Sequence, residues 1–272
     1  MMLVGTRAFE HVSGYKFVDA ADVDNPQLEQ LDLAPVNLPD KFVSTHLPNL
    51  QNRSVMIVGN GDVWEYGSII DQYECVIRIN SMYGWKNDPH HDGMRMTMWA
   101  GLPAFAVTPL RATASQWTNS HFGRVAAGLE IIWCVSAYQC SARAYRWLRN
   151  NSLLSKLCSV PDPLRILDHH IHRLPPELAA ELFSMPVLFN GATGITRFEL
   201  LLTGVKIALL VYLAGAREIH ICGFDFFELK QENMWAGHDR LLNIRVVQFI
   251  RDASRREGRL FTWREQASVE PK

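Results

Sequence analysis

SVMIVGN at residues 54–60 and CVIRIN at residues 75–80 are two short, apolar runs rich in β-branched side chains. Such runs are typical of strands, and each of these ends in an asparagine, Asn60 or Asn80. Because turns follow both runs, the two asparagines are predicted at strand ends. The first run also ends in the Gly59-Asn60-Gly61 turn, which is where the dinucleotide-binding fold begins.

Similar runs recur along the chain and alternate with helical or loop segments. Two helices are predicted from apolar periodicity, one over 205–214 closed by Gly215 and one over 239–256 closed by Gly258. Strands that alternate with helices indicate an α/β fold, with a Rossmann-like, mostly parallel sheet covered on both faces. The further predicted strands are MTMWAG (96–101), LEIIWCVS (129–136), LRILD (164–168), EIHICGF (218–224) and RLFTW (259–263).

Composition narrows the class of function. The chain has 272 residues and a formal net charge of −1, so no global basic field attracts nucleic acid. The N-terminus lacks a basic segment followed by an apolar stretch, which predicts a cytoplasmic protein. The five scattered cysteines form no CxxC pattern and are interpreted as reduced thiols.

The domain organisation is predicted to be simple. Residues 1–50 are rich in Asp, Asn and Pro and read as an irregular lead-in. Residues 51–272 are expected to form one catalytic domain. Within it, 85–125 and 159–190 hold several Pro and His residues and are interpreted as lid or acceptor segments.

The glycine turn does not complete the NAD fingerprint. Trp64 stands where the third glycine should be, and Asn80 stands where an acidic residue would bind a ribose. An NAD site is therefore disfavoured. Asn60 and Asn80 remain as amide donors to a phosphate or ribose in one crevice, with Gly59 and Gly61 shaping the turn. The alternative interpretation is that both asparagines only form turns.

A second group of candidates lies in the C-terminal third. Thr203-Gly204 precedes an apolar helix, and such a pair can present a hydroxyl and free N–H groups to an anion. The strand after that helix ends in Gly223-Phe224-Asp225. His238 stands at the head of the last predicted helix, where an exposed imidazole could act as general base.

Together these segments resemble a known enzyme family. VMIVGNGD with CVIRIN is similar to the large sialylmotif of animal-type sialyltransferases, which form glycosyltransferase family 29. LTGVKIALLVYLAGAREIHICGFDFF resembles their small sialylmotif and, in its spacing, the compact bacterial sialyltransferases of family 42. GHDRLLN resembles the motif that carries the catalytic histidine. The resemblance implies a GT-A-like, single-domain glycosyltransferase, and it covers about 55–80, 200–228 and 237–263.

The resemblance implies a role for each matched residue. Asn60 and Asn80 are expected to contact the CMP half of an activated sugar, with Gly59 and Gly61 as part of that nucleotide site. Thr203 and Gly204 are expected to face the carboxylate of the donor sugar, and His238 to deprotonate the acceptor hydroxyl. The competing sugar-facing pair is Thr193-Gly194 in FNGATGIT, and Asp225 is a further candidate.

The chain also departs from the family pattern. The disulfide of the animal enzymes has neither of its cysteines here, which agrees with a reducing compartment. Asn243 replaces the acidic residue expected five positions after the histidine. The motif that holds the leaving phosphate is missing, so its stabiliser is unassigned, with Arg78 and Tyr83 as candidates.

The implied chemistry is single displacement with inversion, in which His238 is the base and CMP leaves. This scheme needs no metal and no further cofactor. The sequence offers no recognised metal motif, since Asp22-Val23-Asp24 lies in the lead-in. The His-rich segments 89–92 and 168–172 also lack ligand spacing.

Several alternatives stay open. The sugar acid is expected to be sialic acid, with Kdo as the second choice because its CMP derivative shares the same groups. A phosphoryl-transfer enzyme or a catalytically inactive nucleotide-binding relative would fit the same fold. The acceptor is expected to be a glycan or a lipid-linked glycan, and the basic run at 251–259 allows peripheral membrane contact. The sequence is silent on linkage and on oligomeric state.

Overall fold

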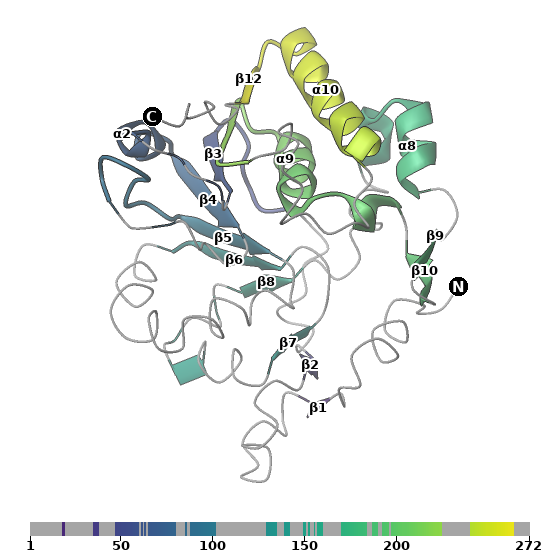
Figure 1. Ribbon diagram of the computed structural model, residues 1–272, viewed down its shortest axis with the longest axis horizontal. Helices are drawn as coiled ribbons and strands as arrows, with labels where there is room; N and C mark the ends of the chain where they lie inside the picture. The colour runs from purple at the N-terminus through teal and green to yellow at the C-terminus, as the bar shows by residue number, and fades with distance from the viewer. Residues whose placement is uncertain are drawn as a thin grey trace, which may run out of the picture.

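A seven-stranded sheet forms the centre of the protein, which was examined as a computed structural model (Figure 1). All the strand pairings within this sheet are parallel. The structure describes residues 18–19, 35–37, 47–59, 61, 63, 65–79, 85, 88–101, 129–134, 139–141, 149–150, 152, 155, 157–159, 170–183, 187–189, 192–195, 197–224 and 240–263.

The order of the strands across the sheet is β12-β11-β3-β4-β5-β6-β8. The chain therefore runs outward from β3 to one edge, then returns to β3's other side and continues to the opposite edge. The sheet has its topological switch point between β3 and β11, where α/β proteins place ligands. The strands are β3 (Ser54–Val58), β4 (Cys75–Ile79), β5 (Met98–Gly101), β6 (Ile131–Cys134), β8 (Leu157–Ser159), β11 (Glu218–Cys222) and β12 (Leu260–Trp263).

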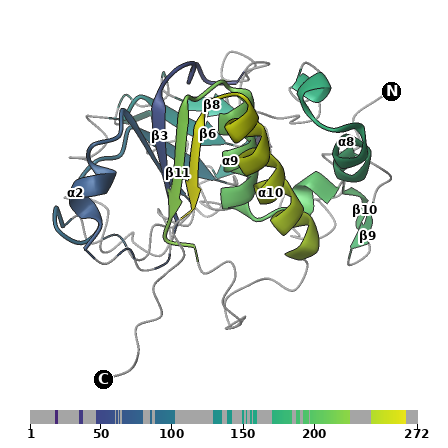
Figure 2. The same ribbon diagram turned by 90° about the horizontal axis from the view of Figure 1, so that it is seen from above.

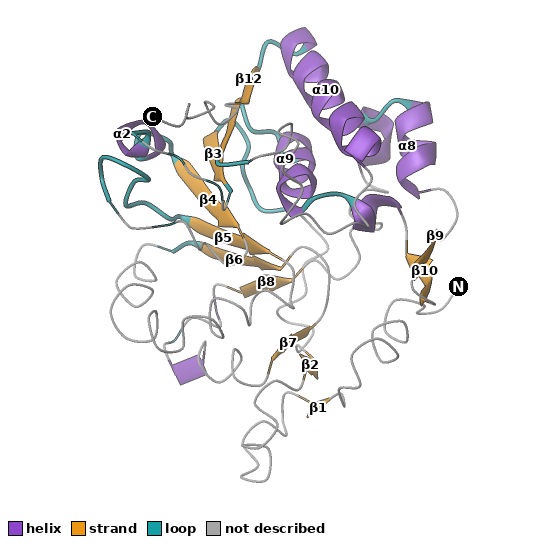
Figure 3. Ribbon diagram, viewed as in Figure 1, coloured by secondary structure: helices purple, strands orange, loops and turns teal. Residues whose placement is uncertain are grey.

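Helices cover the sheet on both faces (Figure 2). α9 and α10 pack on one face, and the short α2 lies against the other. α8 lies beyond α9 and α10 on their side of the sheet, as Figure 3 shows. Among the described residues, the helices are α2 (Gly67–Ile70), α8 (Pro176–Phe183), α9 (Thr203–Leu213) and α10 (Arg240–Arg256), with 3-10 turns η5 (Ile171–Arg173) and η6 (Arg197–Leu200).

The apolar sequence of α9 explains its place in the core. All eleven of its residues are buried, because it lies between the sheet and α10 and has no face to offer to water. α10 is instead amphipathic and buries only the side that faces α9, including Val246 and Ile250. Both helices end as predicted, since Gly215 and Gly258 adopt φ values of 87° and 69° in the left-handed region that suits glycine.

The predicted α/β class and both C-terminal helices are confirmed, with boundaries within two residues of those expected. Of the seven predicted strands, six are observed, and LRILD (164–168) lies outside the described residues. β8 was not predicted. The lead-in also contains two short strands that pair with one another, and β2 pairs with β7. These strands, β1 (Val18–Asp19), β2 (Pro35–Asn37) and β7 (Gln139–Ser141), are too short to show a pattern in sequence. A hairpin of β9 (Val187–Phe189) and β10 (Ala192–Ile195) completes the structure.

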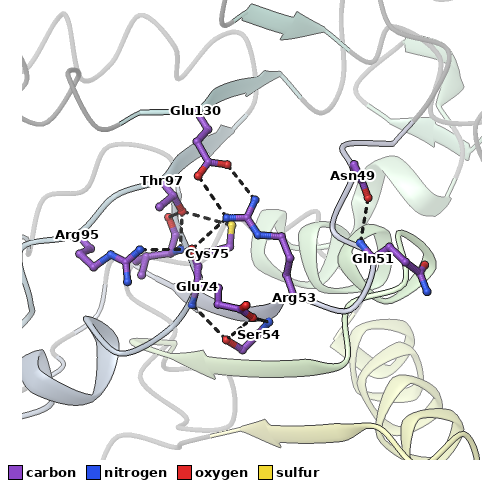
Figure 4. Close-up of polar contacts among 10 residues, drawn as sticks. Asn49, Gln51, Arg53, Ser54, Glu74, Cys75, Arg95, Thr97 and Glu130 are labelled. Atoms are coloured by element: carbon purple, nitrogen blue, oxygen red, sulfur yellow. Dashed lines mark hydrogen bonds and ion pairs between the residues drawn. The ribbon is translucent and has the colours of Figure 1, made fainter.

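Charged side chains tie the amino ends of the strands together (Figure 4). The Arg53 guanidinium donates to the Glu130 carboxylate, with N–O distances of 2.9 and 3.3 Å, and to the Glu74 carbonyl. The Glu74 carboxylate accepts from the Ser54 backbone N–H at 2.6 Å and from its hydroxyl at 3.1 Å. Arg217 adds an ion pair to Glu74 at 3.0 Å. Residues at the amino ends of β3, β4, β6 and β11 are thus cross-linked at the edge of the sheet opposite its carboxyl-terminal edge.

This network makes stability depend on pH. The two hydrogen bonds from Ser54, followed by the nearby arginines, lower the pKa of Glu74 below its ordinary value of 4.5. A carboxylate whose pKa is lower in the folded than in the unfolded protein stabilises the fold at pH values above the unfolded pKa. That contribution disappears as the pH falls through the folded pKa. We expect Glu74→Gln to lower Tm at neutral pH and the gap from the unmodified protein to close below about pH 4.5.

Thermal unfolding of both proteins across this pH range checks the expectation. Glu177→Gln, which removes an exposed carboxylate from α8, is the matched control. A gap for Glu74→Gln that stays constant with pH would contradict a role for the charge of Glu74.

Candidate functional site

The carboxyl ends of the central strands and the amino ends of two helices meet at one edge of the sheet. β3 and β11 end side by side at the switch point, and β4 ends beside β3. α9 and α10 each precede a parallel strand, so both begin at this same edge. Segments near residues 60, 80, 203, 224 and 240 are therefore brought together, although they are far apart in sequence.

The turn after β3 is joined directly to the end of β11. The backbone N–H of Gly59 donates to the Cys222 carbonyl and that of Gly61 donates to the Gly223 carbonyl, both at 2.8 Å. A Cβ on Gly59 would lie 2.0 Å from the Gly223 oxygen, so only glycine allows this approach. The glycines therefore fix the switch point, and their amide protons are already engaged by β11.

Thr203 and Gly204 are the first two residues of α9, whereas the sequence placed them just before the helix. Gly204 is seated against the Phe224 ring, since a Cβ there would lie 2.0 Å from the ring. Thr203 is 8% exposed. No pattern in the sequence pairs Gly204 with Phe224, which lies twenty residues further along the chain. Gly204 thus has a packing role in addition to the sugar-facing role predicted for it.

Asn243 connects α10 to the start of α9. Its side chain is fully buried, and its Oδ1 accepts a hydrogen bond from the backbone N–H of Leu202 at 2.9 Å. Leu202 is the N-cap residue of α9 and has no polar side chain of its own. A neutral amide meets this need without burying a charge. The residue that departs from the family pattern therefore still fixes the two helix ends relative to one another.

Arg78 is not placed as a direct stabiliser of a leaving group. It is 2% exposed in β4, and its Nε and Nη2 donate to backbone carbonyls of the 88–95 loop. Desolvation by burial lowers its pKa to about 10, so it remains charged at neutral pH. The other candidate stabiliser, Tyr83, lies outside the described residues.

The remaining predicted site residues divide into two groups. Asn60, Asn80, Asp225 and His238 lie outside the part of the chain that the structure describes, although their neighbours at the strand and helix ends are placed. Thr193 and Gly194 belong to β10, which is paired with β9 in a hairpin. Of the two competing Thr-Gly pairs, only Thr203-Gly204 begins a helix.

The His-rich segment at 89–92 has a structural explanation. The Asp88 carboxylate accepts from the backbone N–H groups of His90 and His91, and the Asp92 carboxylate accepts from the Asp88 N–H at 2.9 Å. These bonds fold the loop on itself. Among the residues the structure describes, no group of three His, Cys, Asp or Glu side chains is arranged to bind a metal.

His220 is a further histidine of the central sheet, and the structure accounts for it. It lies in β11 two residues before the strand's end, on the α2 face. Its Nε2 lies 2.9 Å from the Tyr66 hydroxyl and its Nδ1 contacts the Thr262 hydroxyl. Both ring nitrogens of His220 therefore already have hydrogen-bond partners.

Fold and site together define an α/β protein with a seven-stranded parallel sheet and a candidate nucleotide site at its switch point.

Cys75 and Cys222 are buried free thiols. No helix in the described ranges is both long and apolar enough to cross a bilayer.

Solved structures that the chain resembles are sialyltransferases, the family that the sequence motifs suggested. An α-2,3-sialyltransferase from Campylobacter jejuni is 13% identical, with a TM-score of 0.46 over 82% of this chain and 81% of that one. A mammalian sialyltransferase is 12% identical, with a TM-score of 0.44 over 79% and 70%. CstII from Campylobacter jejuni, solved with CMP-3FNeuAc, is 16% identical, with a TM-score of 0.42 over 78% and 80%.

No family model matches the sequence, and no curated protein matches it. At these identities and TM-scores, the structural likeness by itself assigns neither a family nor an activity to the chain.

Proposed function

We propose that this protein is an inverting glycosyltransferase that moves a 2-keto sugar acid, sialic acid first, from its CMP derivative to a glycan hydroxyl. The observation that carries the proposal is the convergence at the switch point. Three segments resemble sialylmotifs, and the first two, which lie more than a hundred residues apart in the chain, supply β3 and β11, the strands paired at the switch point. The third segment supplies α10 and β12, and β12 pairs with β11. Because all parallel strands end at one edge, it is the pairing of β3 with β11 that supports the proposal.

The proposed donor site lies at the carboxyl-terminal edge of the sheet, where β3, β4 and α9 meet. The turn that carries Asn60 is fixed by the Gly59 and Gly61 hydrogen bonds to β11. Asn80 directly follows β4, the neighbouring strand. Two amide side chains at adjacent strand ends suit the hydroxyl and phosphate groups of a nucleoside monophosphate. The first turn of α9, with Thr203, supplies the positive end of a helix dipole for the sugar carboxylate.

The transfer requires one base and a held leaving group. His238 stands two residues before α10, whose first residue Arg240 lies at the same edge. An imidazole there can take the proton of the acceptor hydroxyl as that oxygen attacks the anomeric carbon from the face opposite CMP. The bond to the phosphate oxygen breaks as the new bond forms, so the anomeric configuration inverts. We assign no metal or further cofactor to this scheme.

Two alternative functions differ from this proposal in the donor sugar or in the metal ligands that they require. A CMP-Kdo transferase would use the same edge and differs only in the sugar. A phosphoryl-transfer enzyme would need acidic Mg²⁺ ligands at the strand ends, where Asp225 is the candidate. A cytoplasmic location and contact with a lipid-linked acceptor belong to the proposal as well.

Nucleotide binding is the first test. We expect calorimetric titration to show CMP bound in preference to UMP, GMP and NAD. Asn80→Ala is expected to weaken CMP binding roughly tenfold or more, because it removes hydrogen bonds made in a desolvated site. Asn150→Ala, at an exposed asparagine, is the matched control and should bind CMP normally. If CMP binds no better than the other nucleotides, the donor class is wrong and a phosphoryl-transfer function is favoured.

A further inference from the structure

Arg78 is a buried cation close to the end of β4, two residues before Asn80. Its Nη2 donates to the carbonyls of Asp92 and Gly93 at 2.7 and 3.1 Å, and its Nε donates to that of Arg95 at 3.0 Å. The guanidinium also lies 4.1 Å from the centroid of the Trp85 ring. A buried charge is tolerated only with such partners, so its position and that of the 88–95 loop determine one another.

The 88–95 loop is attached on its other side to the start of α2. The backbone N–H groups of Tyr66 and Gly67 donate to the carbonyls of His91 and His90 at 3.0 and 3.1 Å. Gly67 allows the two backbones to touch, because a Cβ there would lie 2.4 Å from the Pro89 oxygen. The Asp71 carboxylate accepts from the backbone N–H groups of Met94 and Arg95. The loop thus bridges β4 and α2.

The segment between β3 and α2, residues 59–67, is consequently held at both ends. At its start, Gly59 and Gly61 donate to the end of β11. At its end, Tyr66 and Gly67 donate to the 88–95 loop, which Arg78 holds. The segment contains Asn60, and Arg78 precedes Asn80 on the adjacent strand. Besides the direct pairing of β3 with β4, a second path of contacts therefore joins the two strand ends that precede the asparagines, and a single guanidinium lies on it.

We propose that Arg78 is a positioning residue, which sets the 59–67 segment relative to the end of β4 and so spaces Asn60 and Asn80 for a nucleoside monophosphate. The ligand in this statement rests on the proposed function. The coupling itself, from Arg78 through the loop to Tyr66 and Gly67, rests on the contacts alone. Lysine keeps the charge but lacks the planar set of donors that reaches three carbonyls, so it cannot replace arginine here.

The test compares Arg78→Lys with Arg217→Met. Arg217 is an exposed arginine at the opposite edge of the sheet, bound to the Asn52 carbonyl and to Glu74. The coupling is measured as the rate of hydrogen exchange at the Tyr66 and Gly67 amides, and CMP affinity is measured by calorimetry. Both measurements are made at a temperature where every variant is folded. We expect Arg78→Lys to speed exchange at both amides and to weaken CMP binding, each roughly tenfold or more. Arg217→Met should lower Tm but leave both the exchange rates at Tyr66 and Gly67 and the CMP affinity unchanged.

Unchanged exchange at Tyr66 and Gly67 in folded Arg78→Lys overturns the proposal. Faster exchange with unchanged CMP affinity, in a protein whose Asn80→Ala variant loses CMP, also overturns it, because Arg78 would then only stabilise the loop. If the unmodified protein does not bind CMP, the proposed function fails, and exchange alone decides the coupling.

Should Arg78→Lys fail to fold, Trp85→Phe takes its place. The Trp85 Nε1 donates to the Gly93 carbonyl at 2.7 Å, and phenylalanine removes that bond while keeping a ring under the guanidinium. The same exchange and affinity comparisons then apply to it.

Discussion

Replacing His238 with alanine is expected to lower the rate of sugar transfer by roughly a hundredfold to ten-thousandfold, the usual worth of general-base catalysis. CMP affinity should stay near that of the unmodified protein, because the histidine is proposed to act on the acceptor and not on the nucleotide.

The measurement is CMP release from CMP-sialic acid and from CMP-Kdo in the presence of a panel of glycan acceptors. His172→Ala, at an exposed histidine in η5, is the matched control and should transfer normally. Equal loss in both variants would remove His238 from its proposed role. Absence of turnover with either donor in a protein that binds CMP would favour the inactive nucleotide-binding relative.

Gly59→Ala is expected to damage the switch point itself. The added Cβ would lie 2.0 Å from the Gly223 carbonyl oxygen, which is backbone and cannot rotate away. Overpacking of this kind costs about 1–3 kcal/mol. The two strand ends must separate to accommodate it, so the hydrogen bonds of Gly59 and Gly61 to β11 should weaken together with CMP binding.

Chemical denaturation, together with amide exchange at Gly61, measures this effect. Gly258→Ala provides the comparison, because nothing lies within 4 Å of its added Cβ and only its φ of 69° is unfavourable. Both variants should be less stable, but only Gly59→Ala should speed exchange at Gly61. Normal protection of Gly61 in Gly59→Ala would show that β3 and β11 are not in such close contact.

Much of the fold could be predicted because it follows from local patterns. The runs at 54–58 and 75–79 are strands whose side chains are buried on both faces. In the strand at 218–222, Glu218 and His220 are only half-buried. The helix over 203–213 has apolar residues on every side, and the structure buries all eleven of its residues. Two-residue and three-residue strands such as β1 and β7 could not be predicted, because they are too short to carry a period.

The candidate site was predicted only in part. Glycine turns, strand-end asparagines and a Thr-Gly pair are visible in sequence because each depends on its own neighbours. The roles of Gly204 against Phe224 and of Asn243 beneath Leu202 were not predictable, since each joins residues at least twenty positions apart. Arg78 was one candidate stabiliser of the leaving phosphate, whereas its Nε and Nη2 donate to backbone carbonyls of the 88–95 loop.

The sequence by itself determined six of the seven strands of the central sheet and the two C-terminal helices, together with the glycines that end those helices. These follow from short-range periodicity and backbone sterics. Only the tertiary structure decided the strand order, and therefore that β11 returns beside β3 and brings the second motif next to the first, more than a hundred residues away in the chain. Strand order depends on long-range burial, which no local pattern specifies, and it is what turns separate motifs into a single candidate site.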